Sequence, residues 1–220
     1  MKKIFLVLII LFTITSIYGQ NFKRYQAKSG IIKYKVEGIS KGTEILYFDN
    51  FGSDEAKETK IKTSVMGFTQ ENNQRTVMND ATIFVADYNT KTYTKMPNPF
   101  FELTQQGSQN IIDAEKFGEE IMKNVGGKMV GEETVLGKPC KIWEIAKIGT
   151  KTWTHKFIPL KIEIDMMGIK TYYIATSIEL DVTVPAEKFK LPDGFTEKKN
   201  PGLNEMLKNM ENFQNNEEED

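Results

Sequence analysis

From residue 31 to residue 184 the chain is a succession of short strand-like segments separated by turn-forming residues. In the first segment Ile32, Tyr34 and Val36 alternate with charged residues, which is the period of two that a half-buried strand requires. Turn signals such as Gly38 to Gly42 and Asp87 to Thr90 recur between the segments. This spacing predicts an antiparallel meander that closes into a barrel or half-barrel, and it argues against a βαβ fold.

The other predicted strands share alternating or continuous apolar residues. They are 43–49, 55–66, 76–86, 91–96, 129–135, 140–148, 152–157, 160–166 and 171–184. One helix is expected to interrupt them, because Ser108 can act as its N-cap and Gly126 and Gly127 can end it. The predicted fold is therefore mainly β, a half-open β-barrel wrapped around one or two helices.

The N-terminus has the layout of a secretory signal peptide. Lys2 and Lys3 precede the apolar run Ile4 to Phe12, and Gly19 comes just before Gln20. The run is shorter than the roughly 20 residues that a membrane-spanning helix needs. We therefore expect residues 1–19 to be removed on export to the periplasm or the cell exterior, and the protein not to be an integral membrane protein.

The rest of the chain divides into two parts. Residues 20–196 are expected to form one β domain. Residues 197–220 combine a short amphipathic helix, at Pro201 to Phe213, with an acidic tail of disordered character.

Charge and cysteine content exclude several classes. The formal net charge is −1, and Arg24 and Arg75 are the only arginines, so nucleic acid is not an expected partner. Cys140 is the only cysteine, which rules out an intramolecular disulfide. The fold must therefore be held together by its core.

Catalytic patterns are scarce. His155 is the only histidine, so a histidine metal pair is impossible. Cys140 and His155 could in principle form a nucleophile and base, but nothing in the sequence brings them together. No nucleophile elbow, phosphate-binding loop or dinucleotide fingerprint occurs. We expect no catalysis, no metal and no cofactor.

Large apolar residues occur on both faces of several predicted strands. A thick ordinary core would explain them, and so would a curved sheet around an apolar hollow. On the second hypothesis ten residues are candidates for lining the hollow. They are Tyr34, Val36, Phe48, Phe84, Trp153, Phe157, Ile162, Ile164, Tyr172 and Ile174.

Four stretches resemble the bacterial lipoprotein-carrier fold, the LolA/LolB-like group and its exported relatives. The stretches are Gly131 to Cys140, Trp153 to Lys161, Phe189 to Gly194 and Met78 to Phe84. Their order and spacing match over most of residues 28–195. The resemblance implies an incomplete antiparallel barrel folded over helices, with an apolar hollow that shelters acyl chains and serves binding and transport.

Two functions remain open at this point. The first is a periplasmic or secreted binding protein for a lipid or a lipidated protein. The second is an envelope sensor or protein-interaction domain that uses the same sheet without lipid cargo.

Overall fold

The structure, a computed structural model, describes residues 23–65, 67–79, 81–98, 101, 114–166 and 168–198. The predicted signal peptide, the N-terminal turn of the predicted helix and the C-terminal amphipathic helix lie outside the described residues.

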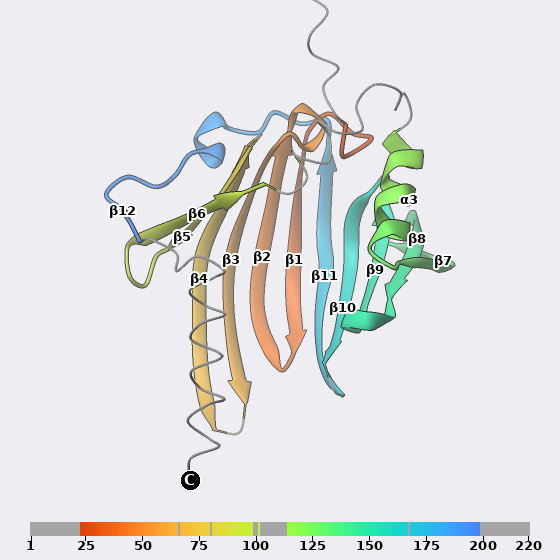
Figure 1. Cartoon of the computed structure of the whole chain (residues 1–220), viewed down its shortest axis with the longest axis horizontal. Coiled ribbons are helices and arrows are strands. Elements are labelled where there is room, and N and C mark those ends of the chain that lie inside the picture. The colour runs from red at the N-terminus through yellow and green to blue at the C-terminus, as the bar shows by residue number, and fades with distance from the viewer. Residues whose placement is uncertain are drawn as a thin grey trace, which may run out of the picture.

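Twelve strands form one sheet in the order β12-β6-β5-β4-β3-β2-β1-β11-β10-β9-β8-β7 (Figure 1). The strands are β1 (Gly30–Gly38), β2 (Ser40–Asp49), β3 (Asp54–Val65), β4 (Phe68–Asn79), β5 (Thr82–Asp87), β6 (Thr92–Pro97), β7 (Lys128–Val135), β8 (Lys138–Ile145), β9 (Thr150–His155), β10 (Ile158–Met166), β11 (Ile169–Leu180) and β12 (Thr196–Glu197). All neighbours are antiparallel except β12, which pairs with β6 in parallel.

The sheet consists of two meanders joined side by side. Strands β1 to β6 follow one another across one half, strands β7 to β11 cross the other, and β1 pairs with β11 at the junction. Because β7 and β12 are free edges, the sheet does not close into a barrel. The predicted fold class, a mainly β, half-open sheet, is confirmed.

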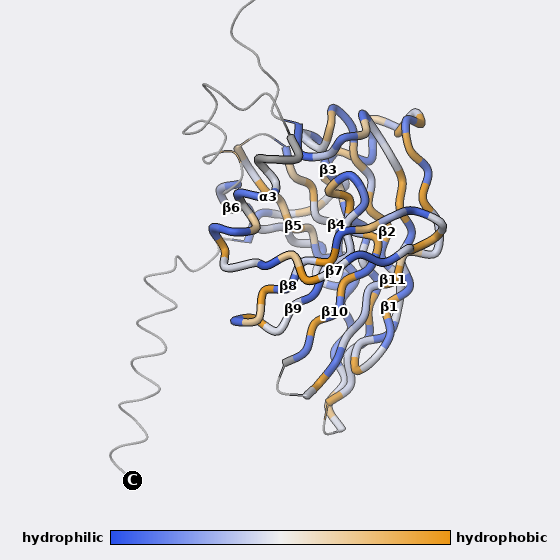
Figure 2. Tube along the Cα trace, turned by 90° about the vertical axis from the view of Figure 1, so that its right-hand side faces the viewer, coloured by the Kyte–Doolittle hydropathy of each residue, from blue (hydrophilic) through white to orange (hydrophobic). Residues whose placement is uncertain are grey.

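Irregularities of register accompany the curvature of the sheet. The register shifts between Lys33 and Tyr34 where β1 meets β11, and between Pro159 and Lys161 where β10 meets β9. An extra residue in one strand bends it and increases the local twist. Both meanders curl toward the same side, on which the helix α3 (Ala114–Asn124) lies (Figures 1 and 2).

We call the side that carries α3 the concave face and the other side the convex face. On β1 and β2 the concave face presents buried Ile32, Leu46 and Phe48, which pack with Tyr25 from the N-terminal segment. The convex face of β2 to β5 presents a second cluster that contains Tyr47 and Val77.

The segment after β11 covers this convex cluster. Val184 is buried in it, and Phe189, from the short helix η3 (Ala186–Phe189), packs against it. The segment then reaches β6 and ends as β12, so Glu197 belongs to the sheet although the predicted domain ended at residue 196.

Four sequence predictions about the strands were wrong in detail. The predicted strand 171–184 ends at Leu180. The predicted strand 76–86 is two strands, because the chain turns between Asn79 and Thr82, and the first of them, β4, begins already at Phe68. The predicted strand 140–148 ends at Ile145 and continues as the short helix η2 (Ala146–Ile148). Phe157 lies in the turn after β9 with a φ of 64°, so it does not alternate with Trp153 on one strand.

Candidate functional site

An apolar strip runs along the concave face where the two meanders meet. Val36 of β1 pairs with Tyr173 of β11, and Tyr173 pairs with Ile162 of β10. Ile164 follows two residues later on the same face. Val36 is buried, whereas Tyr173, Ile162 and Ile164 are each half-buried. The strip is therefore an apolar surface that water still reaches.

Tyr34 anchors this strip to the neighbouring strands. Its ring is buried, and its hydroxyl donates a hydrogen bond of 2.6 Å to the carbonyl of Pro159. Burial raises the pKa of Tyr34 well above its ordinary value, and the charge of Glu44 adds to this. The phenol is thus a neutral hydrogen-bond donor that fixes β10 against β1.

The polar part of the concave face lies on β2 and β3. Glu44 pairs in register with both Tyr34 and Thr59, so all three side chains share this face. The Thr59 hydroxyl donates a hydrogen bond of 2.9 Å to the Glu44 carboxylate. Lys57, two residues before Thr59, also faces this side and lies 3.8 Å from Glu55.

The N-terminal segment closes one end of the concave face. The Tyr25 ring meets Phe48 edge to face with 4.7 Å between ring centroids, and its hydroxyl donates a 2.6 Å hydrogen bond to buried Glu55. Arg24 forms an ion pair with the same carboxylate. Buried charges are tolerated where they are paired and hydrogen-bonded, as Glu55 is here.

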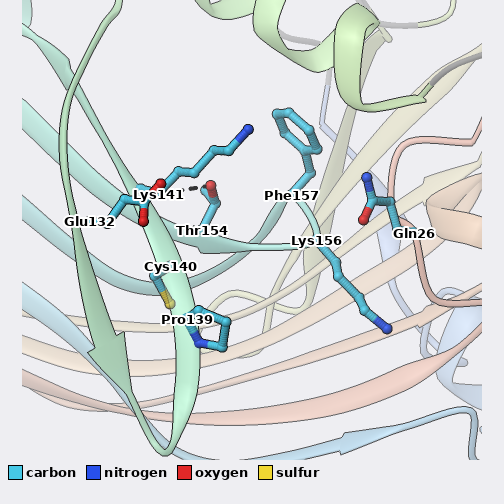
Figure 3. A pocket seen from close by; sticks show the side chains of 8 residues that line it. All are labelled: Gln26, Glu132, Pro139, Cys140, Lys141, Thr154, Lys156 and Phe157. Atoms are coloured by element: carbon cyan, nitrogen blue, oxygen red, sulfur yellow. Dashed lines mark hydrogen bonds between the residues drawn. The ribbon is translucent and has the colours of Figure 1, made fainter.

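A hollow of about 210 Å³ lies beside this end, between β7 to β9 and the N-terminal segment (Figure 3). Its lining residues are Gln26, Glu132, Pro139, Cys140, Lys141, Thr154, Lys156 and Phe157. In Figure 3 the Phe157 ring points toward helix α3. Lys141 and Glu119 of α3 form an ion pair of 2.9 Å that holds the helix here. The hollow is smaller than most pockets for drug-sized ligands, which hold roughly 300–1,000 Å³.

The structure separates the ten residues that the sequence grouped together. Tyr34, Val36, Phe48, Ile162 and Ile164 share the concave face. Phe157 borders the hollow from its turn. Phe84, Tyr172 and Ile174 lie on the convex face. Trp153 belongs to the same buried cluster as Tyr34 and Phe48, beside the register shift at Pro159.

The contacts of these four residues explain their positions. Trp153 pairs in register with Lys161, whose ammonium lies 4.0 Å from the centre of the indole, and Trp153 donates a hydrogen bond to Glu133. Phe84 pairs with Val77 in the convex cluster. Tyr172 and Ile174 pair with Glu163 and Lys161, which also face the convex side.

Sequence reasoning missed two residues of the concave face. The first is Tyr173, which belongs to the strip in place of the predicted Tyr172. Because the two tyrosines are adjacent and chemically identical, the alternation pattern could not show which of them lies on the concave face. Glu44 is the other; its position two residues before buried Leu46 was the available signal.

Cys140 and His155 each have a local partner. The Cys140 thiol is buried and lies 3.5 Å from the carbonyl oxygen of Lys138, and burial raises its pKa. A ring nitrogen of His155 lies 2.9 Å from the carbonyl oxygen of Pro139. Within the described residues, no group of three or more histidine, cysteine, aspartate or glutamate side chains could hold a metal ion.

No family model matches this sequence, and no curated protein matches it. Across the described ranges, no helix has the length and apolar character needed to cross a membrane.

Solved structures with a similar chain path exist at low identity. An uncharacterised conserved protein from Thermus thermophilus is 10% identical with a TM-score of 0.48, and the match covers 81% of this chain and 94% of that one. MucB is 12% identical with a TM-score of 0.43, over 79% of this chain and 60% of that one. LprF from Mycobacterium bovis is 10% identical with a TM-score of 0.32, and the match covers 74% of this chain and 90% of that one. Identities of this size say nothing about individual side chains.

Proposed function

We propose that the protein is an exported binding protein whose concave face holds the acyl chain of a lipid or of a lipidated protein, without catalysis. The observation that carries this proposal is the half-buried apolar strip of Tyr173, Ile162 and Ile164 beside buried Val36. Because the sheet ends in two free edges, it does not close around this strip.

The energy available from such a strip is sufficient for binding. Each CH₂ group moved from water to an apolar surface contributes about 0.8 kcal/mol before the entropy of association is subtracted. Branched and aromatic side chains on three adjacent strands provide a continuous surface for several such groups. Affinity then depends on chain length and does not require a charged contact.

The test compares two isoleucines on adjacent strands and opposite faces. Ile162 of β10 and Ile174 of β11 are both half-buried, but Ile162 faces the concave side and Ile174 the convex side. Ile162→Glu places a carboxylate in the strip and should reduce binding of a fluorescent fatty-acyl probe at least tenfold. Ile174→Glu is the matched control, with the same chemical change, and should bind the probe like the unaltered protein.

Circular dichroism of both variants separates binding from folding. Equal probe affinity in Ile162→Glu and in the unaltered protein would show that the strip does not hold the chain. Equal loss of binding in both variants, with intact spectra, would likewise show that the acyl chain is not held specifically by the concave face.

A second function, as an envelope protein-interaction domain, is favoured by the edge strand β7. Met129 and Val130 of this strand are about half exposed, and no strand of the described sheet covers this edge. Free strand edges recruit extended segments of other proteins. Met129→Lys would weaken such a partner's binding while leaving acyl-probe affinity unchanged.

A further inference from the structure

The concave face is divided into an apolar half and a polar half. The apolar strip occupies β1, β11 and β10. Across β2 to β5 a single cross-strand row of polar side chains shares the same face, each in register with the next. The row consists of Glu44, Thr59, Gln74 and Asp87. The row begins at Glu44, directly beside Tyr34, so the polar and apolar halves meet in the middle of the concave face.

Glu44 carries a charge with no counter-charge in contact. Its carboxylate accepts the hydrogen bond from Thr59, but within the described part of the chain no lysine, arginine or histidine comes within ion-pair distance of it. The side chain is half-buried. A half-buried carboxylate with no cation in contact can bind a cation supplied by a ligand through a charge-assisted hydrogen bond.

Lys57 supplies the opposite charge nearby. It faces the same side from β3, one diagonal step from Glu44, which corresponds to roughly 7–8 Å between such positions. Its ammonium is only loosely paired, at 3.8 Å from Glu55, and Glu55 is already bound by Arg24. Both charges act on the neighbouring Tyr173 phenol. Burial raises the pKa of Tyr173, the charge of Glu44 raises this pKa further, and the charge of Lys57 lowers it.

We propose that the concave face selects zwitterionic lipids. The acyl chain follows Val36, Tyr173 and Ile162. Lys57 lies farther from this strip than Glu44 does, so the headgroup folds back across β2 and β3, with its ammonium at Glu44 and its anionic group toward Lys57. The inference rests on the proposed function, because the same face must first hold an acyl chain. A free fatty acid or an anionic lipid fits less well, since its negative charge would meet Glu44 without an ammonium between them.

The experiment uses three probes with one and the same acyl chain and different headgroups. They are lysophosphatidylethanolamine, which is zwitterionic, lysophosphatidylglycerol, which is anionic, and monoacylglycerol, which is neutral. Affinities are measured by calorimetry below the concentration at which the probes form micelles. The unaltered protein should bind the zwitterionic probe roughly tenfold more tightly than the anionic one, as one charge-assisted hydrogen bond would give.

Glu44→Gln keeps the acceptor for Thr59 and removes the charge, so the protein should stay folded and lose the tenfold preference. Glu163→Gln is the matched control, because Glu163 is a half-buried acid on the convex side of β10. It should keep the preference. Lys57→Met should weaken both phospholipid probes and leave the neutral probe unaffected.

The outcomes separate this inference from the proposed function. Equal affinity for all three probes in the unaltered protein, or a preference that survives Glu44→Gln, would overturn the headgroup selection and leave acyl binding standing. Failure of all three probes, including the neutral one, would overturn the proposed function and the inference together.

Discussion

Helix α3 packs on the β9–β10 turn through Gly118. Replacing this glycine by alanine should therefore not give the gain in stability that is usual in the middle of a helix. A methyl group at Gly118 would lie 2.6 Å from carbon atoms of the Phe157 ring, closer than real side chains approach one another. The ring cannot simply withdraw, because Phe157 sits in a two-residue turn in which both Lys156 and Phe157 have positive φ. Gly118→Ala should therefore push the helix away from the turn.

Two opposing contributions set the magnitude. Alanine in place of a mid-helix glycine stabilises a helix by about 1 kcal/mol. Overpacking against an aromatic ring costs about 1–3 kcal/mol. Gly118→Ala should thus be neutral to destabilising by about 2 kcal/mol, the reverse of what helix propensity alone predicts.

Chemical denaturation followed by circular dichroism measures this effect in two backgrounds. When the ring is removed by Phe157→Ala, the clash disappears, and Gly118→Ala should become stabilising by about 1 kcal/mol. The coupling between the two sites is the test. An alanine at 118 that stabilises the protein equally in both backgrounds would refute the packing of α3 on this turn.

The remaining predictions concern the convex cluster and the thiol. Burial raises the pKa of Glu58, but hydrogen bonds from Lys188 and Arg75 outweigh it and leave the pKa below the ordinary value. The stability they provide is present above the unfolded-state pKa of about 4.3 and is lost as the pH falls through the lower folded-state pKa. Glu58→Gln should cost about 1 kcal/mol at pH 7 and flatten the acid limb of a stability profile; an unchanged limb would contradict the assignment. Cys140→Ala should lower the free energy of unfolding by about 1–2 kcal/mol and leave acyl binding intact. The native thiol should react slowly with iodoacetamide at neutral pH, because burial raises the pKa of Cys140. Rapid alkylation of the folded protein, or a folded Cys140→Ala variant that has lost binding, would contradict these expectations.

The succession of strands along the chain was largely readable from the sequence, because turn residues mark most connections, whereas the pairing of β1 with β11 was not predicted. Gly38, Gly137 and Gly168 lie at turns and take positive φ, where glycine is favoured. Alternation then fixed the face of Tyr34 and Val36 correctly. A turn without glycine or proline, between Asn79 and Thr82, was passed over, and residues 68–75 of β4 were not predicted as strand.

The composition of the site was less predictable, because strand faces depend on register. The register shift between Lys33 and Tyr34 determines whether Tyr172 or Tyr173 lies on the concave face. No residue type in the sequence marks the position of this shift. Trp153 was predicted to line the hollow because alternation along one strand would put it on the same face as Phe157, but Phe157 lies in the turn after β9. The Trp153 ring is buried in the core cluster, where Lys161 covers it and Glu133 accepts its hydrogen bond. A long charged side chain can bury an aromatic ring as well as an apolar one can, since its methylene groups pack while its charge stays in water.

The measurement that tests acyl binding most directly is native mass spectrometry of the protein purified from the cell envelope in the absence of added lipid. We expect a protein ion with an added mass that organic solvent removes and that lipid analysis identifies as an acyl-bearing molecule. The same preparation of Ile162→Glu should lack that mass, and Ile174→Glu should retain it. An unaltered protein that is always recovered without added mass, and that takes up no acyl probe when one is offered, would contradict acyl binding by the concave face.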